Sequence, residues 1–114
     1  MKKILFSLFI ILLSFATGSF AQSRLDACNV FGRIFIAVQP SYAQFLIYEE
    51  ETEGLADLIV YEEDNKLYAD EQGKWFFVDV RAFAEYTVYF VEDRDKAHFT
   101  VYFTDEPGYA GCNN

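Results

Sequence analysis

The sequence has few of the residues that metal sites and nucleophilic catalysis require. Its 114 residues include one histidine, His98, and two cysteines, Cys28 and Cys112, too small a set for a site built from imidazole and thiolate ligands. No serine lies in a nucleophile elbow, and no glycine-rich loop leads from a strand into a helix. Carboxylate pairs are so abundant that any one pair is weak evidence for acid–base catalysis. We therefore expect no catalytic residue, no dedicated metal site and no cofactor.

Basic residues are also scarce. Nine lysines and arginines stand against 18 aspartates and glutamates, so the formal net charge is −9 at pH 7. Such a chain repels nucleic acid and anionic lipid, which carry negative charge themselves. The composition therefore predicts no nucleic-acid partner, and the acidity favours solubility or a cationic partner without naming one.

The first 21 residues have the layout of a signal peptide. Lys2 and Lys3 precede an apolar run over residues 4–16, and Ser19 and Ala21 occupy the small-residue positions of a cleavage site. The run is too short for a comfortable membrane span, and no stop-transfer pattern follows it. We predict cleavage after Ala21, a mature chain without a transmembrane anchor, and a periplasmic or extracellular location. Cleavage removes two lysines and no acidic residue, which changes the net charge from −9 to −11.

Two alternatives for this segment are less favoured. One is an uncleaved membrane anchor. The other is a lipoprotein signal, because LDAC (Leu25–Cys28) vaguely resembles a lipobox. However, Asp26 stands where a small residue is needed, and polar residues separate the motif from the apolar run.

The two cysteines lie near the two ends of the mature chain. In an oxidising compartment two cysteines most simply form one bond, so we predict a Cys28–Cys112 disulfide. A domain this small has a modest core and gains from a covalent link that restricts the unfolded chain. Free or intermolecular thiols are the alternative.

A repeat with a period near 13 residues runs through the chain. An alanine marks each unit, as in AQFLIY, ADLIVY, AEYTVYF and AHFTVYF, and successive alanines are 13, 13, 15, 13 and 13 residues apart. The residue before the alanine is apolar in every unit but one, where it is Lys96. Such self-similarity predicts a fold built from equivalent units. The marker alanines are Ala43, Ala56, Ala69, Ala84, Ala97 and Ala110.

Each unit has the alternation of a short β-strand. In ADLIVY (56–61), Leu58 and Val60 face one side, while Ile59 and Tyr61 face the other. One face is wholly apolar, and β-branched and aromatic residues suit a half-buried pleated surface. No segment after the signal has a helical apolar stripe. We expect one all-β domain with six short strands, near residues 32–37, 44–49, 57–62, 74–80, 86–91 and 99–104.

The β-domain is expected to span residues 32–112, after an N-terminal segment at 22–31 and before a tail at 113–114. Its short acidic connectors contain turn residues such as Gly54 and Pro107, which favours a meander of hairpins or a small barrel. Equivalent units also allow parallel neighbours, each strand pairing with one that does not adjoin it in sequence. Parallel connections are normally longer than these connectors, so this alternative stays open.

Aromatic residues provide the candidates for a binding surface. Tyr48, Tyr61, Tyr89 and Tyr102 recur at one strand position. An exposed row of this kind can stack on a sugar or pack on a protein, whereas a covered row forms a second core. Trp75 is either an exposed aromatic anchor or an ordinary core tryptophan. The core interpretation is favoured in both cases, because a small chain needs its aromatic residues for stability.

Polar residues supply two weaker candidates. The acidic turns at 62–65 and 93–95 offer clustered oxygen atoms for calcium, although neither has the spacing of an EF-hand loop, and solvated turns are the favoured interpretation. His98 occupies a repeat position that is polar in the other units, which favours a half-exposed residue at a strand start over a catalytic base. The equivalent residues are Gln44, Asp57, Asp70 and Glu85.

The unit ADLIVY, the recurring pattern of alanine, polar residue and alternating apolar residues, and the closing VYFTDEPGYAG resemble the 7(1) septoil knot domain family of small bacterial proteins. The resemblance covers about 80 residues, from Gly32 to Cys112. It implies a compact β-rich fold whose backbone is tied in a seven-crossing knot, a rare exception to the rule that chains avoid knots. Members often end in AGW, so Cys112 replaces a tryptophan, which indicates that a disulfide partly takes over its packing. The resemblance implies no activity and no site residues.

These observations favour an exported, non-enzymatic β-domain that acts as a structural or interaction module with a protein or glycan partner. A calcium- or glycan-binding module is the alternative. A small hydrolase is the least favoured function.

Overall fold

The computed structural model describes residues 27–113, so the predicted signal peptide and its cleavage site, residues 22–26, and Asn114 lie outside the described part. Seven strands and six one-turn 3-10 helices alternate along residues 27–113. No helix in this range is long and apolar enough to cross a membrane.

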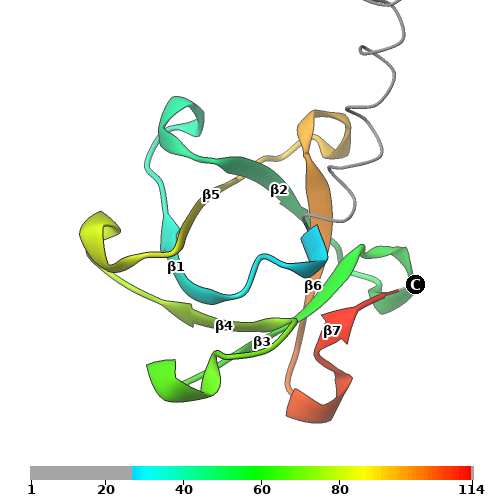
Figure 1. Ribbon diagram of the computed structural model, residues 1–114. Helices are drawn as coiled ribbons and strands as arrows, with labels where there is room; N and C mark the ends of the chain where they lie inside the picture. Colours follow the sequence, from blue (N-terminus) through cyan, green and yellow to red (C-terminus); the bar gives the residue numbers. More distant parts are fainter. Residues whose placement is uncertain (1–26, 114) are drawn as a thin grey trace, which may run out of the picture.

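Six parallel strands close into a barrel (Figure 1). Around the barrel the order is β1, β5, β2, β6, β3 and β4, and β4 pairs with β1 to complete the ring. The all-β class and the small barrel are confirmed, while the meander of hairpins is wrong because hairpins would make sequence neighbours antiparallel. The strands are β1 (Gly32–Ile36), β2 (Phe45–Glu49), β3 (Leu58–Glu62), β4 (Lys74–Phe77), β5 (Tyr86–Phe90) and β6 (Phe99–Thr104).

The strand boundaries lie within one residue of the predicted ones, except in β4. This strand ends at Phe77 rather than at residue 80, because the next connector starts at Val78, whose N–H donates to the Ile34 carbonyl of β1 at 2.9 Å. The alternation of apolar residues continues past Phe77 in sequence, so the pattern alone overestimates the length of this strand.

Every connector contains a 3-10 helix of a single turn, which the sequence pattern does not predict. The helix ends at the residue before the marker alanine, and the alanine N–H bonds to the carbonyl three residues back, as Ala43 does to Pro40 at 3.2 Å. Three residues are too few to show an apolar stripe. The helices are η1 (Pro40–Tyr42), η2 (Glu53–Leu55), η3 (Lys66–Tyr68), η4 (Arg81–Phe83), η5 (Arg94–Lys96) and η6 (Pro107–Tyr109).

The connector from β1 to β2 straddles β5 and is hydrogen-bonded to it on both sides. The Ala37 N–H donates to the Val88 carbonyl at 2.8 Å, and the Gln44 N–H donates to the Thr87 carbonyl at 2.9 Å. Successive carbonyls of a strand point to opposite sides, so the connector begins on one side of β5 and ends on the other. It spans about two strand spacings, roughly 10 Å. This short span explains why a connector below the usual length of a parallel crossover is sufficient.

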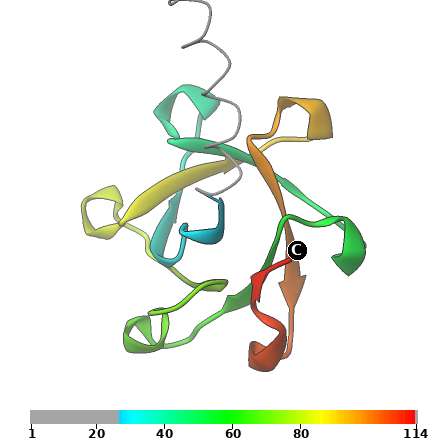
Figure 2. The ribbon, with the colours of Figure 1, turned by 45° about the vertical axis from the view of Figure 1, so that its right-hand side comes forward.

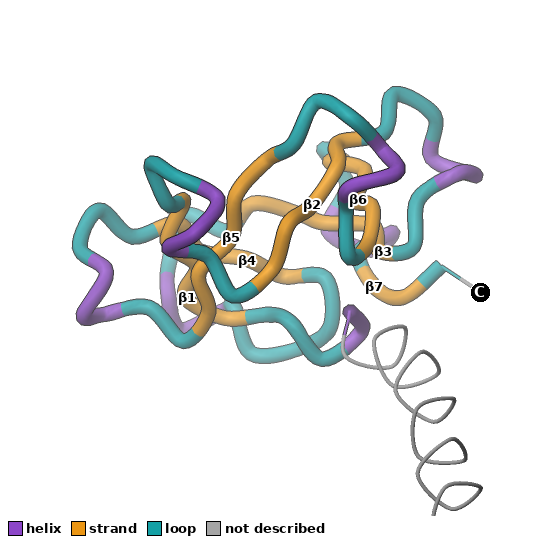
Figure 3. The backbone as a smooth tube through the Cα atoms, turned by 90° about the horizontal axis from the view of Figure 1, so that it is seen from above, coloured by secondary structure: helices purple, strands orange, loops and turns teal. Residues whose placement is uncertain are grey.

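The same pair of bonds recurs in three other connectors, and we call it the straddling pair. Figure 3 shows the connectors looping outward from the strands. In each bond the N–H of the first residue donates to the carbonyl of the second. Over β6 the bonds are Glu50 to Val101 (2.7 Å) and Asp57 to Thr100 (3.1 Å). Over β1 they are Val78 to Ile34 (2.9 Å) and Glu85 to Arg33 (2.8 Å), and over β2 they are Val91 to Ile47 (2.8 Å) and His98 to Leu46 (2.6 Å).

The long step in the repeat follows from the geometry of a ring of six strands. Crossing one strand per connector places β1, β2 and β3 at alternate positions, and a further step of the same kind would return to the position of β1. Instead β4 lies directly between β3 and β1, and β5 and β6 then fill the remaining gaps. The 15-residue spacing from Ala69 to Ala84 falls at this step, where an extra turn precedes β4. The seven-crossing knot implied by the family resemblance stays a prediction.

One residue from each strand contributes to a buried layer inside the barrel. Each strand pairing shifts the register by two residues: Ile47, for example, lies opposite Phe99 rather than opposite its repeat equivalent Val101. Equal shifts at all six pairings place equivalent residues at one level around the barrel. The predicted apolar face is therefore the inner face. The layer consists of Ile34, Ile47, Val60, Trp75, Val88 and Val101, each 0% exposed.

The N-terminal segment 27–31 lies within the ring of strands and completes this core (Figure 1). Ala27 and Val30 are each 1% exposed and belong to the same apolar cluster. The Trp75 indole Nε1 donates a 2.7 Å hydrogen bond to the Val30 carbonyl. The favoured interpretation of Trp75 as a core residue is therefore confirmed and the exposed binding anchor is wrong, because its ring fills the barrel and its polar atom is satisfied there.

The last repeat unit ends in a short seventh strand, β7 (Gly111–Cys112), antiparallel to β3. It pairs with Leu58 and Ile59 at the start of β3, whereas β4 pairs with Tyr61 and Glu62 at its end. Consequently β7 occupies the part of the β3 edge that β4 leaves unpaired.

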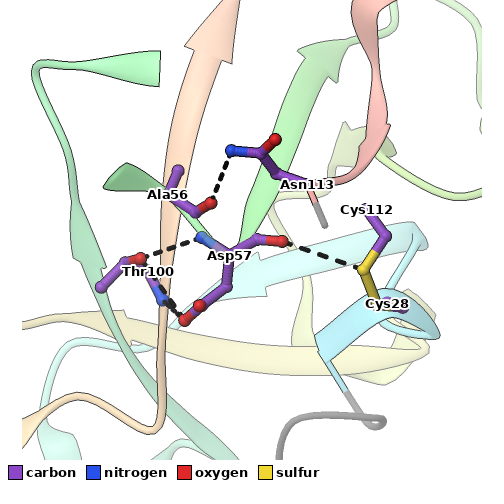
Figure 4. The surroundings of a disulfide bond; sticks show 6 residues. All are labelled: Cys28, Ala56, Asp57, Thr100, Cys112 and Asn113. Carbon is purple, nitrogen blue, oxygen red and sulfur yellow. Dashed lines mark hydrogen bonds between the residues drawn. A yellow bond between two sulfur atoms is a disulfide. The ribbon is translucent and has the colours of Figure 1, made fainter. Parts of the chain in front are cut away.

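The predicted Cys28–Cys112 disulfide is present and joins the N-terminal segment to β7 (Figure 4). Its sequence separation is 84 residues, and the two Cα atoms are 5.2 Å apart. The Cys112 Sγ lies 3.9 Å from the Asp57 carbonyl oxygen, a packing contact because a disulfide sulfur has no hydrogen to donate. The Asn113 amide donates to the Ala56 carbonyl at 2.9 Å, which fastens the C-terminal end beside β3.

Removing the disulfide should lower the free energy of unfolding substantially. We expect Cys28→Ser with Cys112→Ser to cost up to about 4–5 kcal/mol, because a bond that closes so long a loop restricts the unfolded chain. Urea denaturation measures the difference. Wild-type protein kept in reductant should behave like the double variant, and equal stability of all three samples would contradict the prediction.

Gly73 should tolerate no side chain. Its φ is +81°, and a Cβ there would overlap the Gly111 nitrogen and the Ile59 carbonyl, where β7 and β3 meet the turn before β4. Gly73→Ala should cost at least about 2 kcal/mol, from left-handed strain and displaced backbone. Gly54→Ala is the matched control, since nothing lies within 4 Å of its Cβ position, and it should stay within about 0.5 kcal/mol of wild type. Thermal unfolding of both variants measures the two losses of stability. Similar losses in Gly73→Ala and Gly54→Ala would refute the packing argument.

Candidate interaction surface

Apolar side chains project from the ends of the 3-10 helices, at the position before each marker alanine. The helices lie around the outside of the barrel (Figure 2), and the sixth equivalent position holds Lys96. We call these six positions the peripheral ring. Its apolar members, each with more than half of its surface exposed, are Tyr42, Leu55, Tyr68, Phe83 and Tyr109.

The exposure of the peripheral ring follows from the way the connectors cross the strands. A connector that passes outside a strand carries its helix at the apex, away from the barrel core, so the last helix residue has little apolar surface to cover it. The apolar residue before each alanine is visible in the sequence, but its exposure is not. The signal that marks it is an apolar residue that recurs within otherwise polar, acidic turns.

The four repeated tyrosines form a half-buried belt on the outer face of the barrel. The two-residue stagger separates them, so that each lies opposite a non-aromatic residue, as Tyr48 does opposite Thr100 and Tyr89 opposite Leu46. The sequence allows either an exposed row or a covered second core, and the burial of the four side chains lies between these two cases. A role in binding stays a prediction for these residues: Tyr48, Tyr61, Tyr89 and Tyr102.

Two grooves lie on the outer surface at equivalent places in the repeat. The first lies where β4 meets β1, and Phe76 and Phe83 are among its lining residues; the second lies where β5 meets β2 and contains Tyr89. Each has a volume of about 570 Å³ and is open to solvent. A shift of 13 residues relates Phe76 to Tyr89. We call them the Phe groove and the Tyr groove.

The acidic turns use oxygen atoms to cap the 3-10 helices. Asn65 Oδ1 accepts a 3.0 Å hydrogen bond from the Leu67 N–H at η3, and Asp93 Oδ1 accepts one of 3.0 Å from the Asp95 N–H at η5. Within residues 27–113 no three His, Cys, Asp or Glu side chains are grouped to hold a metal ion. The described oxygen atoms of these turns thus serve as helix caps, and calcium binding at the turns stays a prediction.

An ion pair fastens the connector between β5 and β6. Arg94 Nη2 lies 2.7 Å from Glu50 Oε1, and the Glu50 side chain is buried. The Arg94 guanidinium also lies 5.3 Å from the centre of the Tyr48 ring. Arg94 thus supplies the opposite charge that a buried carboxylate needs, and it partly covers one member of the tyrosine belt.

The partly buried Lys74 side chain forms an ion pair with the exposed Glu71 at 2.8 Å, and this hydrogen bond raises the pKa of the lysine amine. A group with a raised pKa stabilises the fold below its ordinary pKa and loses that contribution as the pH rises through the raised value. The contribution is therefore constant near neutral pH and is lost only in the alkaline range.

His98 is a hydrogen-bond acceptor at a strand start. Its Nδ1 accepts a 2.9 Å bond from the Leu46 N–H, while the His98 N–H donates to the Leu46 carbonyl. The acceptor role requires an unprotonated Nδ1. The predicted equivalence to the polar residues of other units is confirmed for Gln44, Asp57 and Glu85, because their side chains accept matching bonds. These are Thr87 N–H to Gln44 Oε1 (2.9 Å), Thr100 N–H to Asp57 Oδ2 (3.0 Å) and Arg33 N–H to Glu85 Oε1 (3.5 Å).

The effect of a His98 substitution on stability should depend on whether the new side chain can accept the hydrogen bond from the Leu46 N–H. His98→Gln should keep the stability of the wild type, since Gln44 serves the same purpose in its own unit, whereas His98→Leu should lose about 1 kcal/mol. Urea denaturation measures the loss, and hydrogen exchange of the Leu46 amide should quicken in His98→Leu alone. Equal loss in both variants would show that the imidazole acts in some other way.

The comparisons with known proteins agree with this architecture. The family model of the 7(1) septoil knot domain matches residues 27–113, which is the whole described part, including the N-terminal segment and β7. A search of curated proteins found no match. The family description names a fold and no ligand or reaction, so it assigns no role to any residue. The fold, the repeat and this match show that the chain belongs to the 7(1) septoil knot domain family.

Proposed function

We propose that this protein is an exported, non-enzymatic interaction module that binds its partner through the peripheral ring. The observation that carries the proposal is the repeated exposure of apolar side chains at five of the six equivalent helix ends. Tyrosine, phenylalanine and leucine at these positions add little to the core, yet they leave apolar surface in contact with water. Surface of this kind favours association.

Export is supported by the disulfide between Cys28 and Cys112, since such bonds form and persist in oxidising compartments. The predicted signal peptide also favours export. Both the periplasm and the space outside the cell are oxidising compartments in which the disulfide can persist.

A binding role also suits the use that the fold makes of its polar groups. The side chains of His98, Asp57 and Gln44 accept hydrogen bonds from the backbone of neighbouring strands. Glu50 is buried in its ion pair with Arg94. These groups, which would be candidates for acid–base chemistry, contribute instead to the architecture.

Charge limits the choice of partner. The net charge of −9 repels anionic surfaces, so an uncharged or cationic partner is favoured.

Removing the aromatic members of the ring should weaken partner binding while the fold persists. The variant that combines Tyr42→Ser, Tyr68→Ser, Phe83→Ser and Tyr109→Ser should bind envelope fragments of the producing cell at least about tenfold more weakly than wild type, because each substitution removes exposed aromatic surface. Co-sedimentation measures the binding, and a thermal melt verifies the fold.

The matched control combines Val38→Ser and Leu67→Ser, two exposed apolar residues outside the ring. This control should sediment with the envelope as wild type does. Undiminished sedimentation of the ring variant, or equal loss in the control, would refute the proposal.

A further inference from the structure

We propose that the Phe groove and the Tyr groove are two binding sites for an uncharged polysaccharide. The inference rests on the proposed interaction function and names the class of its ligand. It depends on the lining of the two grooves, on their equivalence within the repeat, and on their directions around the barrel.

The Phe groove combines aromatic surface with hydrogen-bonding groups. Phe76, half buried on β4, and Phe83, exposed at the end of η4, present an inner and an outer aromatic surface. Polar side chains line the rest and offer both donors and acceptors. They are Arg33, Asp64, Asn65 and Lys66.

The Tyr groove repeats this plan one unit later. Tyr89 takes the place of Phe76, and Lys96 takes the place of Phe83. Pro40 of η1 and Lys66 of η3 are not related by this shift, and each lines its own groove from another connector. Asp93 and its neighbour Glu92 provide the polar lining. Both grooves thus have an aromatic residue at the same repeat position of a strand, Phe76 or Tyr89, beside charged side chains.

This lining fits the two kinds of surface on a sugar ring. A pyranose presents C–H groups on its faces, which pack on an aromatic ring, and hydroxyl groups around its edge, which bond to amide, carboxylate, ammonium and guanidinium groups. A volume of about 570 Å³ is typical of a small-molecule site and accommodates a short stretch of a glycan chain. Because the groove is open to solvent, a longer chain can continue beyond it.

Other ligands fit less well. A specific protein interface buries about 800 Å² on each partner in a continuous patch, whereas the apolar side chains of this protein are distributed around the barrel and separated by acidic turns. An anionic polysaccharide is repelled by the net charge of −9 and by the carboxylates of Asp64 and Asp93, which line the grooves.

The two grooves face different directions. Along the ring order β4, β1, β5, β2, the Phe groove lies between the first two strands and the Tyr groove between the last two, which is two positions further around a ring of six. One molecule can therefore hold two glycan chains, or two points of one chain, and gain avidity on a polymer.

Isothermal titration calorimetry with soluble hexasaccharides tests the proposal. The probes are cellohexaose, N-acetylated chitohexaose and maltohexaose, which are uncharged, with oligogalacturonate as the anionic comparison. At least one uncharged probe should bind at two sites per protein chain, and oligogalacturonate should not bind. Failure of all three uncharged probes, or binding of oligogalacturonate alone, overturns the proposal.

Single substitutions assign the sites. Phe83→Ala should remove one site and leave the other unchanged, and Tyr89→Leu, which keeps apolar bulk without the ring, should remove the other. At the affected site the dissociation constant should rise about tenfold. Val38→Ala is the control, because Val38 is an exposed apolar residue outside the peripheral ring that lines neither groove. Equal loss in Val38→Ala and Phe83→Ala overturns the assignment to the grooves.

The experiment separates this inference from the proposed function. If no uncharged hexasaccharide binds, while envelope fragments still retain wild type and release the ring variant, the partner is of another class and the interaction function stands. If protease treatment of the envelope abolishes that retention, the partner is a protein, which also overturns the glycan proposal.

Discussion

The straddling pair, two backbone hydrogen bonds that hold a connector on both sides of the strand it crosses, is the interaction on which the rest of the structure depends. Each pair uses the carbonyls of two consecutive strand residues, such as Thr87 and Val88 of β5. It determines which strand lies between two sequence neighbours, and it allows a short connector to join parallel strands. The order of the barrel is the sum of these local crossings and one exceptional step into β4.

The same interaction explains why one repeat position is polar. The residue that closes each straddling pair donates its N–H to a strand residue and accepts, through its side chain, the N–H of that same residue, as Gln44 does with Thr87. Gln44, Asp57 and His98 differ in charge and shape, but each offers an acceptor atom at the required place. A lone histidine that invites comparison with a catalytic base is thus one of several interchangeable acceptors.

The crossings also shape the surface. A connector that passes outside the barrel carries its 3-10 helix away from the core, so the end of the helix is exposed in every unit. The grooves form where a connector runs beside two paired strands, and the repeat creates more than one of them. The binding surface that we propose therefore occurs more than once on the molecule, which suits a partner with repeating structure.

Several features of the fold are readable from the residues alone. Alternation within each unit predicts five of the six barrel strands to within one residue and identifies the inner face, because a two-residue period has one physical interpretation in so short a segment. Two cysteines in a chain with a predicted signal peptide predict the Cys28–Cys112 bond. The burial of Trp75 is the favoured interpretation of the sequence, whereas the exposure of Phe83 is not readable, since it depends on what the rest of the chain places over that side chain.

What the sequence by itself determined is local: the strands, the apolar face, the acceptor at each strand start and the position of the irregular unit. What only the tertiary structure decided is the pairing of strands that are far apart in the chain, and with it the grooves and the peripheral ring. The physical reason is that backbone N–H and C=O groups are the same in every unit. The sequence of one unit therefore does not specify which strand its connector crosses. That choice depends on closure of a ring of six, on the N-terminal segment held inside it by Trp75, and on β7 at the edge of β3.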